Sequence, residues 1–224
     1  MRREKIVRGL SRAGAAAVLG LIVSGAIGSL AASAALGQTA ETATPAAGAP
    51  EVPAPAAEVN SGDTAWVLMS AALVMLMTPG LAFFYGGLVR RKNVLSVLMQ
   101  CLAILCLVSL QWVILGYSLS FGPDVGHVIG SLGWLGLSGV GAEPNADYAG
   151  TVPHQAFMIF QAMFAVITPA LIIGAFAERI RFTGFCLFSL LWATLVYDPV
   201  AHWVWGVGGF MKEWGALDFA GGAV

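Results

Sequence analysis

The sequence predicts an all-α membrane protein, folded as a polytopic transmembrane helix bundle. Three observations support this prediction: 58% of the residues are hydrophobic and only 10% are charged, the charges leave long uncharged segments between them, and the basic residues form clusters. Soluble globular domains carry about a quarter charged residues, so this composition indicates a lipid environment. The net charge of −1 provides no overall field that would attract nucleic acid.

Four charge-poor segments are each longer than the roughly 20 residues that a helix needs to span the hydrocarbon core. Transmembrane β-strands are shorter and alternate polar with apolar residues, which these segments do not do. We therefore expect helices at about residues 64–89, 94–121, 154–177 and 183–210.

The N-terminal residues 1–37 have the pattern of a secretory signal peptide. Basic residues crowd the first twelve positions, an apolar stretch begins at Ala13, and Ala32-Ser33-Ala34 offers a cleavage position. A retained first transmembrane helix is the alternative, because the apolar stretch is long. Residues 38–62 are rich in Pro and Ala and predict a disordered linker.

The basic clusters predict the orientation of the helices in the membrane. Residues 90–92 (Arg-Arg-Lys) follow the first expected helix, and Arg179 and Arg181 follow the third, so both clusters lie on one side. The positive-inside rule assigns that side to the cytoplasm. The mature N-terminus is then external.

Asp198 is an acidic residue inside the fourth expected helix, where a charge costs a few kcal/mol on insertion scales. His202 follows four residues later, so both side chains share one helical face. The preferred interpretation is a structural Asp198–His202 pair that seals a helix contact. A polar site that faces a transport pathway is the alternative.

Aromatic residues gather in two places. Phe157, Phe160 and Phe164 follow i, i+3, i+7 spacing and form one stripe of a helix. Trp203 and Trp205 end the fourth expected helix. Core packing and an interfacial belt are the commoner uses of such residues, and an aromatic site for a small cation is the alternative.

No pattern typical of a soluble enzyme occurs in the sequence. It has neither a phosphate-binding Gly loop with Lys nor a nucleophile elbow. The three histidines lie in different segments, and Cys101, Cys106 and Cys186 lie in apolar runs. We expect no enzyme activity, no cofactor, no metal and no disulfide framework.

Four pieces of the sequence resemble the signatures of the ammonium transporter family (the Amt/Mep/Rh group), in the family's order. The resemblance covers residues 63–224 and implies an eleven-helix fold, of which this chain supplies the first four helices and the start of the fifth. The chain stops before the histidine that closes the family signature, so we expect a fragment that does not transport alone. The pieces are residues 79–88 with 91–95, 177–182, 199–206 and 215–224.

The resemblance implies roles for four aromatic and acidic residues. Trp205 corresponds to the external aromatic residue that recruits ammonium, and Phe160 and Phe164 correspond to the pore gate below it. Asp218 corresponds to the buried acid that stabilises the ammonium site. Phe164 is thus expected in both the gate and the substrate-binding set.

The resemblance implies structural support from Gln161, beside the gate, and we expect the same role for Asp198 and His202. The implied function is transport: recruitment of ammonium, deprotonation and passage through a hydrophobic pore. An ammonium sensor that signals to a cytoplasmic partner and a helical scaffold without transport are the alternatives. The family further implies a homotrimer in the bacterial inner membrane and a PII-type regulatory partner.

Overall fold

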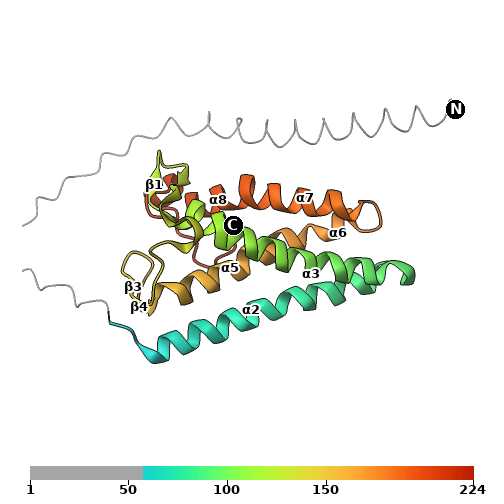
Figure 1. Cartoon of the computed structure of the whole chain (residues 1–224), viewed down its shortest axis with the longest axis horizontal. Helices are drawn as coiled ribbons and strands as arrows, with labels where there is room; N and C mark the ends of the chain where they lie inside the picture. The colour runs from blue at the N-terminus through green and yellow to red at the C-terminus, as the bar shows by residue number, and fades with distance from the viewer. Residues whose placement is uncertain (1–57) are drawn as a thin grey trace, which may run out of the picture. The chain divides into compact units, whose positions relative to one another are not determined.

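The computed structural model describes residues 58–224, which form a bundle of long helices (Figure 1). The predicted signal peptide and residues 38–57 of the predicted linker lie outside the described residues. Within the described part, four helical segments are long and apolar enough to cross a membrane, which confirms the predicted fold class. They are Ser61–Leu88, Arg91–Phe121, His154–Phe176 and Phe182–Glu213.

The first span is the single helix α2 (Ser61–Leu88), which includes the last two residues of the expected linker. Asn60 caps it, because its side-chain oxygen accepts hydrogen bonds from the Gly62 and Asp63 amides at 2.8 and 3.1 Å. The Asn60 amide also donates to the Thr151 carbonyl at 2.8 Å. The start of the first span is therefore tied to the loop before the third.

The second and fourth spans each contain a π-helical turn, a feature that often marks functional sites. Neither turn was expected from the sequence. The second span comprises η2 (Arg91–Asn93), α3 (Val94–Gln111), the π turn η3 (Trp112–Gly116) and α4 (Tyr117–Phe121), and the fourth comprises α7 (Phe182–Trp192), the π turn η5 (Ala193–Tyr197) and α8 (Asp198–Trp205).

The third span and the connecting segments complete the described structure. The long connection before the third span contains two short antiparallel hairpins rather than being wholly irregular. The third span comprises α5 (His154–Leu171) and α6 (Ile173–Phe176), the hairpins are β1 (Asp124–Val125) with β2 (Ile129–Gly130) and β3 (Pro144–Asn145) with β4 (Ala149–Pro153), a 3-10 segment η4 (Leu132–Leu137) lies between them, and α9 (Phe210–Glu213) follows the fourth span.

The core lies where the helices pack on one another. Helix α2 packs against α3 and α5, α3 against α5 and α7, and α4 against α8. Large side chains there are fully buried, among them Trp112, Ile104 and Ile173. By contrast Trp66 and Phe83 on α2 are 74% and 71% exposed. An apolar outer surface of this extent is typical of a face that contacts lipid or another protein.

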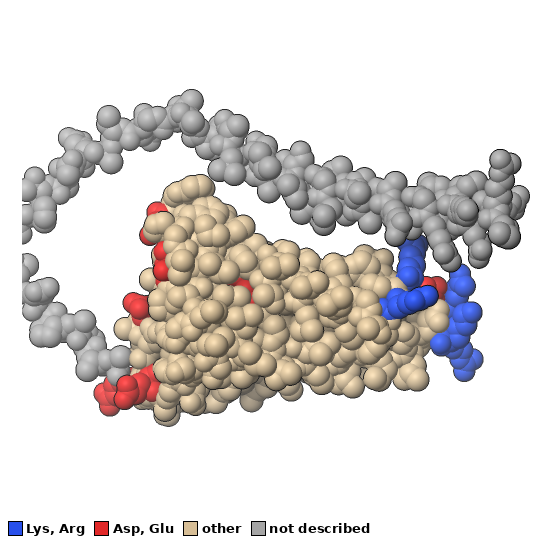
Figure 2. All heavy atoms as spheres, turned by 45° about the horizontal axis from the view of Figure 1, so that its top comes forward, with Lys and Arg blue, Asp and Glu red and all other residues tan. Residues whose placement is uncertain are grey.

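Charged side chains are segregated along the bundle (Figure 2). Lys and Arg gather at the end that carries the connections between α2 and α3 and between α6 and α7, and most acidic residues lie at the other end. At the basic end, Arg90 Nε lies 3.5 Å from Glu178 Oε2. The charge distribution agrees with the expected topology, and the assignment of the basic end to the cytoplasm stays a prediction.

Candidate functional site

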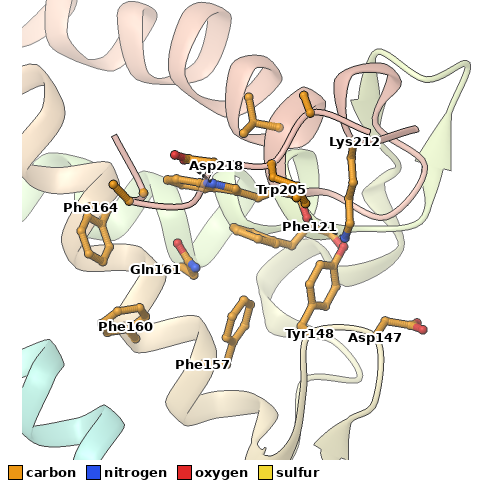
Figure 3. Close-up of a pocket in the computed structure, with 15 residues that line it drawn as sticks. Phe121, Asp147, Tyr148, Phe157, Phe160, Gln161, Phe164, Trp205, Lys212 and Asp218 are labelled. Atoms are coloured by element: carbon orange, nitrogen blue, oxygen red, sulfur yellow. Dashed lines mark hydrogen bonds between the residues drawn. The ribbon is translucent and has the colours of Figure 1, made fainter. Parts of the chain in front are cut away.

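A cavity of about 500 Å³ lies at the acidic end of the bundle, between α5, the end of α8 and the chain that follows α9 (Figure 3). We refer to it as the Trp205 cavity. Its lining is mostly aromatic and aliphatic, with three charged side chains. The lining residues are Phe121, Asp147, Tyr148, Phe157, Phe160, Gln161, Phe164, Val204, Trp205, Lys212, Ala216, Leu217, Asp218, Ala220 and Gly221.

One wall of the cavity is the phenylalanine stripe of α5. Phe160 and Phe164 lie one turn apart, with ring centroids 5.1 Å apart and planes inclined by 76°. Gln161 lies between them in sequence, and its side-chain oxygen is buried without a hydrogen-bond partner among residues 58–224. The spacing predicted this arrangement, because residues at i, i+3 and i+7 share one helical face.

The opposite wall joins Trp205 to Asp218. The Trp205 indole Nε1–H donates to Asp218 Oδ2 at 2.9 Å, and the Ala223 amide donates to the same oxygen at 3.3 Å. This carboxylate therefore fixes the indole ring and also orders the backbone five residues further on. Both hydrogen bonds go to Oδ2, and no group among the described residues donates to Asp218 Oδ1.

A tight glycine turn after Trp205 makes this wall possible. Gly206 ends α8 in an extended conformation, and a Cβ there would lie 2.5 Å from the ring of His202. Gly208 has φ +88°, and a Cβ there would lie 2.6 Å from Asp124. Only glycine fits both positions, because an added Cβ would overlap existing atoms. The turn brings α9, and with it Lys212, back over the cavity.

Tyr148 forms the rim of the cavity together with Lys212. The Tyr148 hydroxyl donates to the Phe121 carbonyl at 2.8 Å and accepts from the Val207 amide at 3.1 Å. Its ring stacks on Phe157 with centroids 5.4 Å apart. Burial raises the pKa of Tyr148 to about 12, so the phenol is neutral at physiological pH. Lys212 Nζ lies 5.7 Å from the centre of this ring.

Asp198 lies outside the cavity, in a sealed polar cluster between the two π-helical turns. Its side chain has no exposed surface. Gln111 Nε2 donates to Asp198 Oδ2 at 2.7 Å, and Ser120 Oγ donates to Oδ1 at 3.4 Å. Gln111 Nε2 also donates to Thr194 Oγ1 at 3.1 Å. Gln111, placed just before η3, thus bonds to residues within and just after η5.

The expected pairing of Asp198 with His202 is wrong, because each side chain bonds to other residues. His202 Nδ1 lies 3.0 Å from the Ser120 carbonyl, and its Nε2 lies 2.9 Å from Asp124 Oδ1. The pattern of i, i+4 spacing suggested a contact within one helix, but α4 packs closely along α8 and offers better-placed partners. Ser120 contacts both residues, because its hydroxyl bonds Asp198 and its carbonyl bonds His202.

Comparison with known sequences identifies the family. Residues 65–224 match the Ammonium Transporter Family. The chain belongs to this family. An ammonium transporter of Bacillus subtilis (strain 168) is 58% identical over 166 residues, which are 74% of this chain and 40% of that protein. An ammonium transporter of Mycobacterium tuberculosis (strain H37Rv) is 48% identical over 185 residues, with 73% and 39% coverage.

Solved structures agree with this family assignment. The crystal structure of Mep2 from Candida albicans matches with a TM-score of 0.67 and 37% identity, over 74% of this chain and 36% of that one. A structure described as a sensor Amt protein matches with a TM-score of 0.65 and 28% identity, over 71% and 39%. This chain therefore spans about 40% of the length of the two ammonium transporters named above.

The structure brings five of the seven expected site residues to one cavity. The other two, Asp198 and His202, belong to α8 itself, do not line the cavity, and bond to residues of the second span and to Asp124. Within residues 58–224, no group of three or more His, Cys, Asp or Glu side chains is arranged to hold a metal ion. The five cavity residues are Phe160, Gln161, Phe164, Trp205 and Asp218.

Sequence reasoning missed two cavity residues. Tyr148 lies in the connection before α5, where no helical spacing relates it to Phe157, so its stacking on that ring was not predicted. Lys212 attracted no interpretation, although it is a basic residue next to the acidic end and six positions before Asp218. The available signal was that Lys212, a basic residue, follows the fourth span on the side where acidic residues gather.

Proposed function

We propose that this chain forms the N-terminal part of a transmembrane pathway for ammonium and ammonia, and that the Trp205 cavity recruits the ammonium cation. The observation that carries the proposal is the hydrogen bond from Trp205 to Asp218 beside the Phe160–Phe164 pair. It supplies an aromatic ring and a carboxylate in one cavity. The family membership of residues 65–224 supports the same function.

Recruitment rests on two attractions that suit a small cation. The electron-rich face of an indole ring attracts ammonium by about 0.5–2 kcal/mol. Asp218 adds a negative charge close to the indole, and it restrains the ring in one orientation through the Nε1–H bond. Because the ring is already held in one orientation, binding of the ion costs little conformational entropy, and more of the attraction contributes to affinity.

Passage beyond the cavity depends on the phenylalanine pair. Phe160 and Phe164 offer a hydrated ion no hydrogen-bond acceptor, and taking a charge into such a constriction is costly. Neutral ammonia avoids this cost, so the proposed sequence is recruitment of the cation, transfer of one proton from ammonium to water in the cavity, and passage of ammonia. We assign Gln161, which lies between the two rings in sequence, to packing of the helix surface there; its buried side-chain oxygen accepts no hydrogen bond among residues 58–224.

A sensor is the second candidate function, because the chain is similar to a sensor Amt protein as well as to transporters. In that case the same cavity binds ammonium, and the signal passes to a cytoplasmic partner at the basic end. Uptake separates the two: a transporter accumulates labelled methylammonium, and a sensor binds it without accumulation.

We infer the orientation, location and assembly of the protein from its family and its charge distribution. We place the basic end in the cytoplasm by the positive-inside rule, and the Trp205 cavity on the external side. The mature N-terminus is then external, and the protein resides in the bacterial inner membrane. Assembly as a homotrimer and a cytoplasmic PII-type partner belong to the same proposal.

Uptake of labelled methylammonium by cells that express the full-length protein containing this segment tests the proposal. We expect saturable uptake that unlabelled ammonium inhibits and that potassium at equal concentration does not. Saturable binding without uptake would favour the sensor. Neither binding nor uptake in correctly folded protein would leave only a structural scaffold.

A further inference from the structure

Among the described residues, Lys212 lies at the opposite end of the bundle from the other basic residues. Among residues 58–224, the other five Lys and Arg side chains belong to the 90–92 cluster and to Arg179 and Arg181 at the basic end. Lys212 instead lines the Trp205 cavity, from the short helix α9. A positive charge in a cavity that attracts a cation calls for an explanation, because like charges repel.

The ammonium group of Lys212 makes the kinds of contact that free ammonium seeks. Its Nζ donates to the Trp205 carbonyl oxygen at 3.3 Å and lies 5.7 Å from the centroid of the Tyr148 ring (Figure 3). A carbonyl acceptor and an aromatic face are the groups that bind small ammonium ions in proteins. Lys212 is thus a tethered analogue of the proposed substrate.

The groups on both sides of this contact are held in place. Helix α9 is tied to the β1–β2 hairpin, because the Phe210 amide donates to the His127 carbonyl at 3.2 Å and His127 Nδ1 lies 3.3 Å from Glu213 Oε2. The Tyr148 hydroxyl is fixed by its own two hydrogen bonds. Lys212 forms no ion pair among the described residues. No carboxylate there neutralises its charge by direct contact.

We propose that the Lys212 ammonium group competes with the transported ion for the Trp205 cavity and so sets a weaker affinity for ammonium. It occupies an acceptor and an aromatic face at the rim, and its charge repels a second cation nearby. Arrival of ammonium displaces the Lys212 head group toward solvent, which its flexible stem permits. This inference rests on the proposed recruitment of ammonium at Trp205.

Charge removal at this one position tests the inference in the full-length protein. Lys212→Met keeps the length of the side chain and removes the charge. We expect the half-saturating concentration of methylammonium uptake to fall about three- to tenfold, the effect of deleting one exposed like charge close to the site. High ionic strength should narrow the difference between the variant and the wild type, because salt screens exposed charges.

Two matched variants separate this effect from general changes. Lys212→Arg keeps the charge and should stay close to the wild-type half-saturating concentration. Lys92→Met makes the same substitution at the basic end and should leave the affinity unchanged. A wild-type or higher half-saturating concentration in Lys212→Met overturns the inference.

A labelling measurement needs no variant and so does not depend on the folding of one. Acetylation of lysine amines in the wild-type protein is followed at Lys212 by mass spectrometry, with and without saturating methylammonium. We expect methylammonium to speed acetylation of Lys212 and to leave acetylation of Lys92 unchanged. Equal Lys212 rates in protein that binds methylammonium overturn the competition.

Recruitment of ammonium at Trp205 and competition by Lys212 can be overturned separately. Wild-type protein without ammonium-sensitive uptake or binding would overturn the proposed function and this inference together. Wild-type uptake that ammonium inhibits, with no response of either Lys212 measurement, would overturn only the inference and leave recruitment at Trp205 intact.

Discussion

Helix α8 has a carboxylate associated with each end, and the two carboxylates differ in their surroundings. Asp198 begins the helix and is fully buried against Gln111 and Ser120. Asp218 accepts a hydrogen bond from Trp205 at the other end of the helix and lines a cavity of about 500 Å³. The same chemical group is thus sealed at one end and accessible at the other.

This difference indicates how the two acids divide their roles. A sealed carboxylate surrounded by donors can fix a helix but has no space for a substrate. A carboxylate that borders a cavity and has one oxygen without a protein donor can act on an ion that enters. Position relative to the cavity, rather than depth in the membrane, therefore separates the proposed structural acid, Asp198, from the proposed functional one, Asp218.

The largest expected effect is that of Asp218→Ala. Removal of the carboxylate frees the indole of Trp205 and deletes the negative charge of the cavity, so we expect uptake of methylammonium to be abolished in the full-length protein. Uptake is measured per folded molecule, with folding judged by size-exclusion chromatography in detergent. Asp63→Ala removes an exposed charge near the start of α2 and should keep wild-type uptake. Wild-type uptake in Asp218→Ala would refute the role of this carboxylate.

Asp198→Asn should reverse this pattern, with a large effect on folding and a small one on transport. An amide group there presents a donor to Gln111 Nε2 or leaves one buried group unsatisfied, a cost of about 1–3 kcal/mol. We expect a several-fold lower folded yield and uptake per folded molecule within about twofold of wild type, if the network only supports α8. Normal yield with lost transport would instead place Asp198 in the pathway.

Trp205→Leu should change affinity more than the maximal rate. Leucine keeps the cavity apolar but removes the cation–π attraction, so we expect a roughly three- to tenfold weaker apparent affinity for methylammonium. Trp203→Leu is the control, because Trp203 bonds the Val128 carbonyl at 2.6 Å and does not line the cavity. Equal effects of both substitutions would show that the indole acts only in packing.

The smallest expected effect concerns pH and the β1–β2 hairpin. Hydrogen bonding to the Gly208 carbonyl, with the nearby Glu213 and Asp124, raises the pKa of His127, and the hydrogen bond from His202 lowers the pKa of Asp124. The His127 contribution to stability is complete below its ordinary pKa of about 6.5 and is lost as pH rises through the raised value. The Asp124 contribution is present above about 3.9 and is lost as pH falls through the lowered value.

We therefore expect the thermal midpoint of the full-length protein to fall slightly as pH rises from 6 to 8. His127→Gln should remove most of this slope, because glutamine does not titrate. An unchanged slope in His127→Gln would show that other groups cause the pH dependence. His127 lies at the acidic end, so His127→Gln should leave the hydrogen bonds of Asp198 unchanged.

Composition and charge placement were enough to predict the four spans, because the bilayer imposes a minimum length and excludes charge. The stripe of Phe160 and Phe164 was also predictable, since helical periodicity alone places them together. The π-helical turns were not, because the residue pattern of Trp112–Gly116 and Ala193–Tyr197 does not distinguish them from the flanking α-helix. The partners of Asp198 were missed because they lie on another span: Gln111 is 87 residues away in sequence.

The Trp205–Asp218 contact shows the limit of sequence reasoning most clearly. The family resemblance named both residues, but spacing offered no reason for them to meet, because a glycine turn at Gly206 and Gly208 reverses the chain between them. Lys212 enters the cavity through the same reversal.

Direct observation of bound methylammonium tests the central claim most directly. A structure of the full-length protein determined with saturating methylammonium should show the ion in the Trp205 cavity, in contact with the face of the indole ring and absent from the ligand-free map. An empty Trp205 cavity in protein that takes up methylammonium, with the ion ordered elsewhere, would contradict the account.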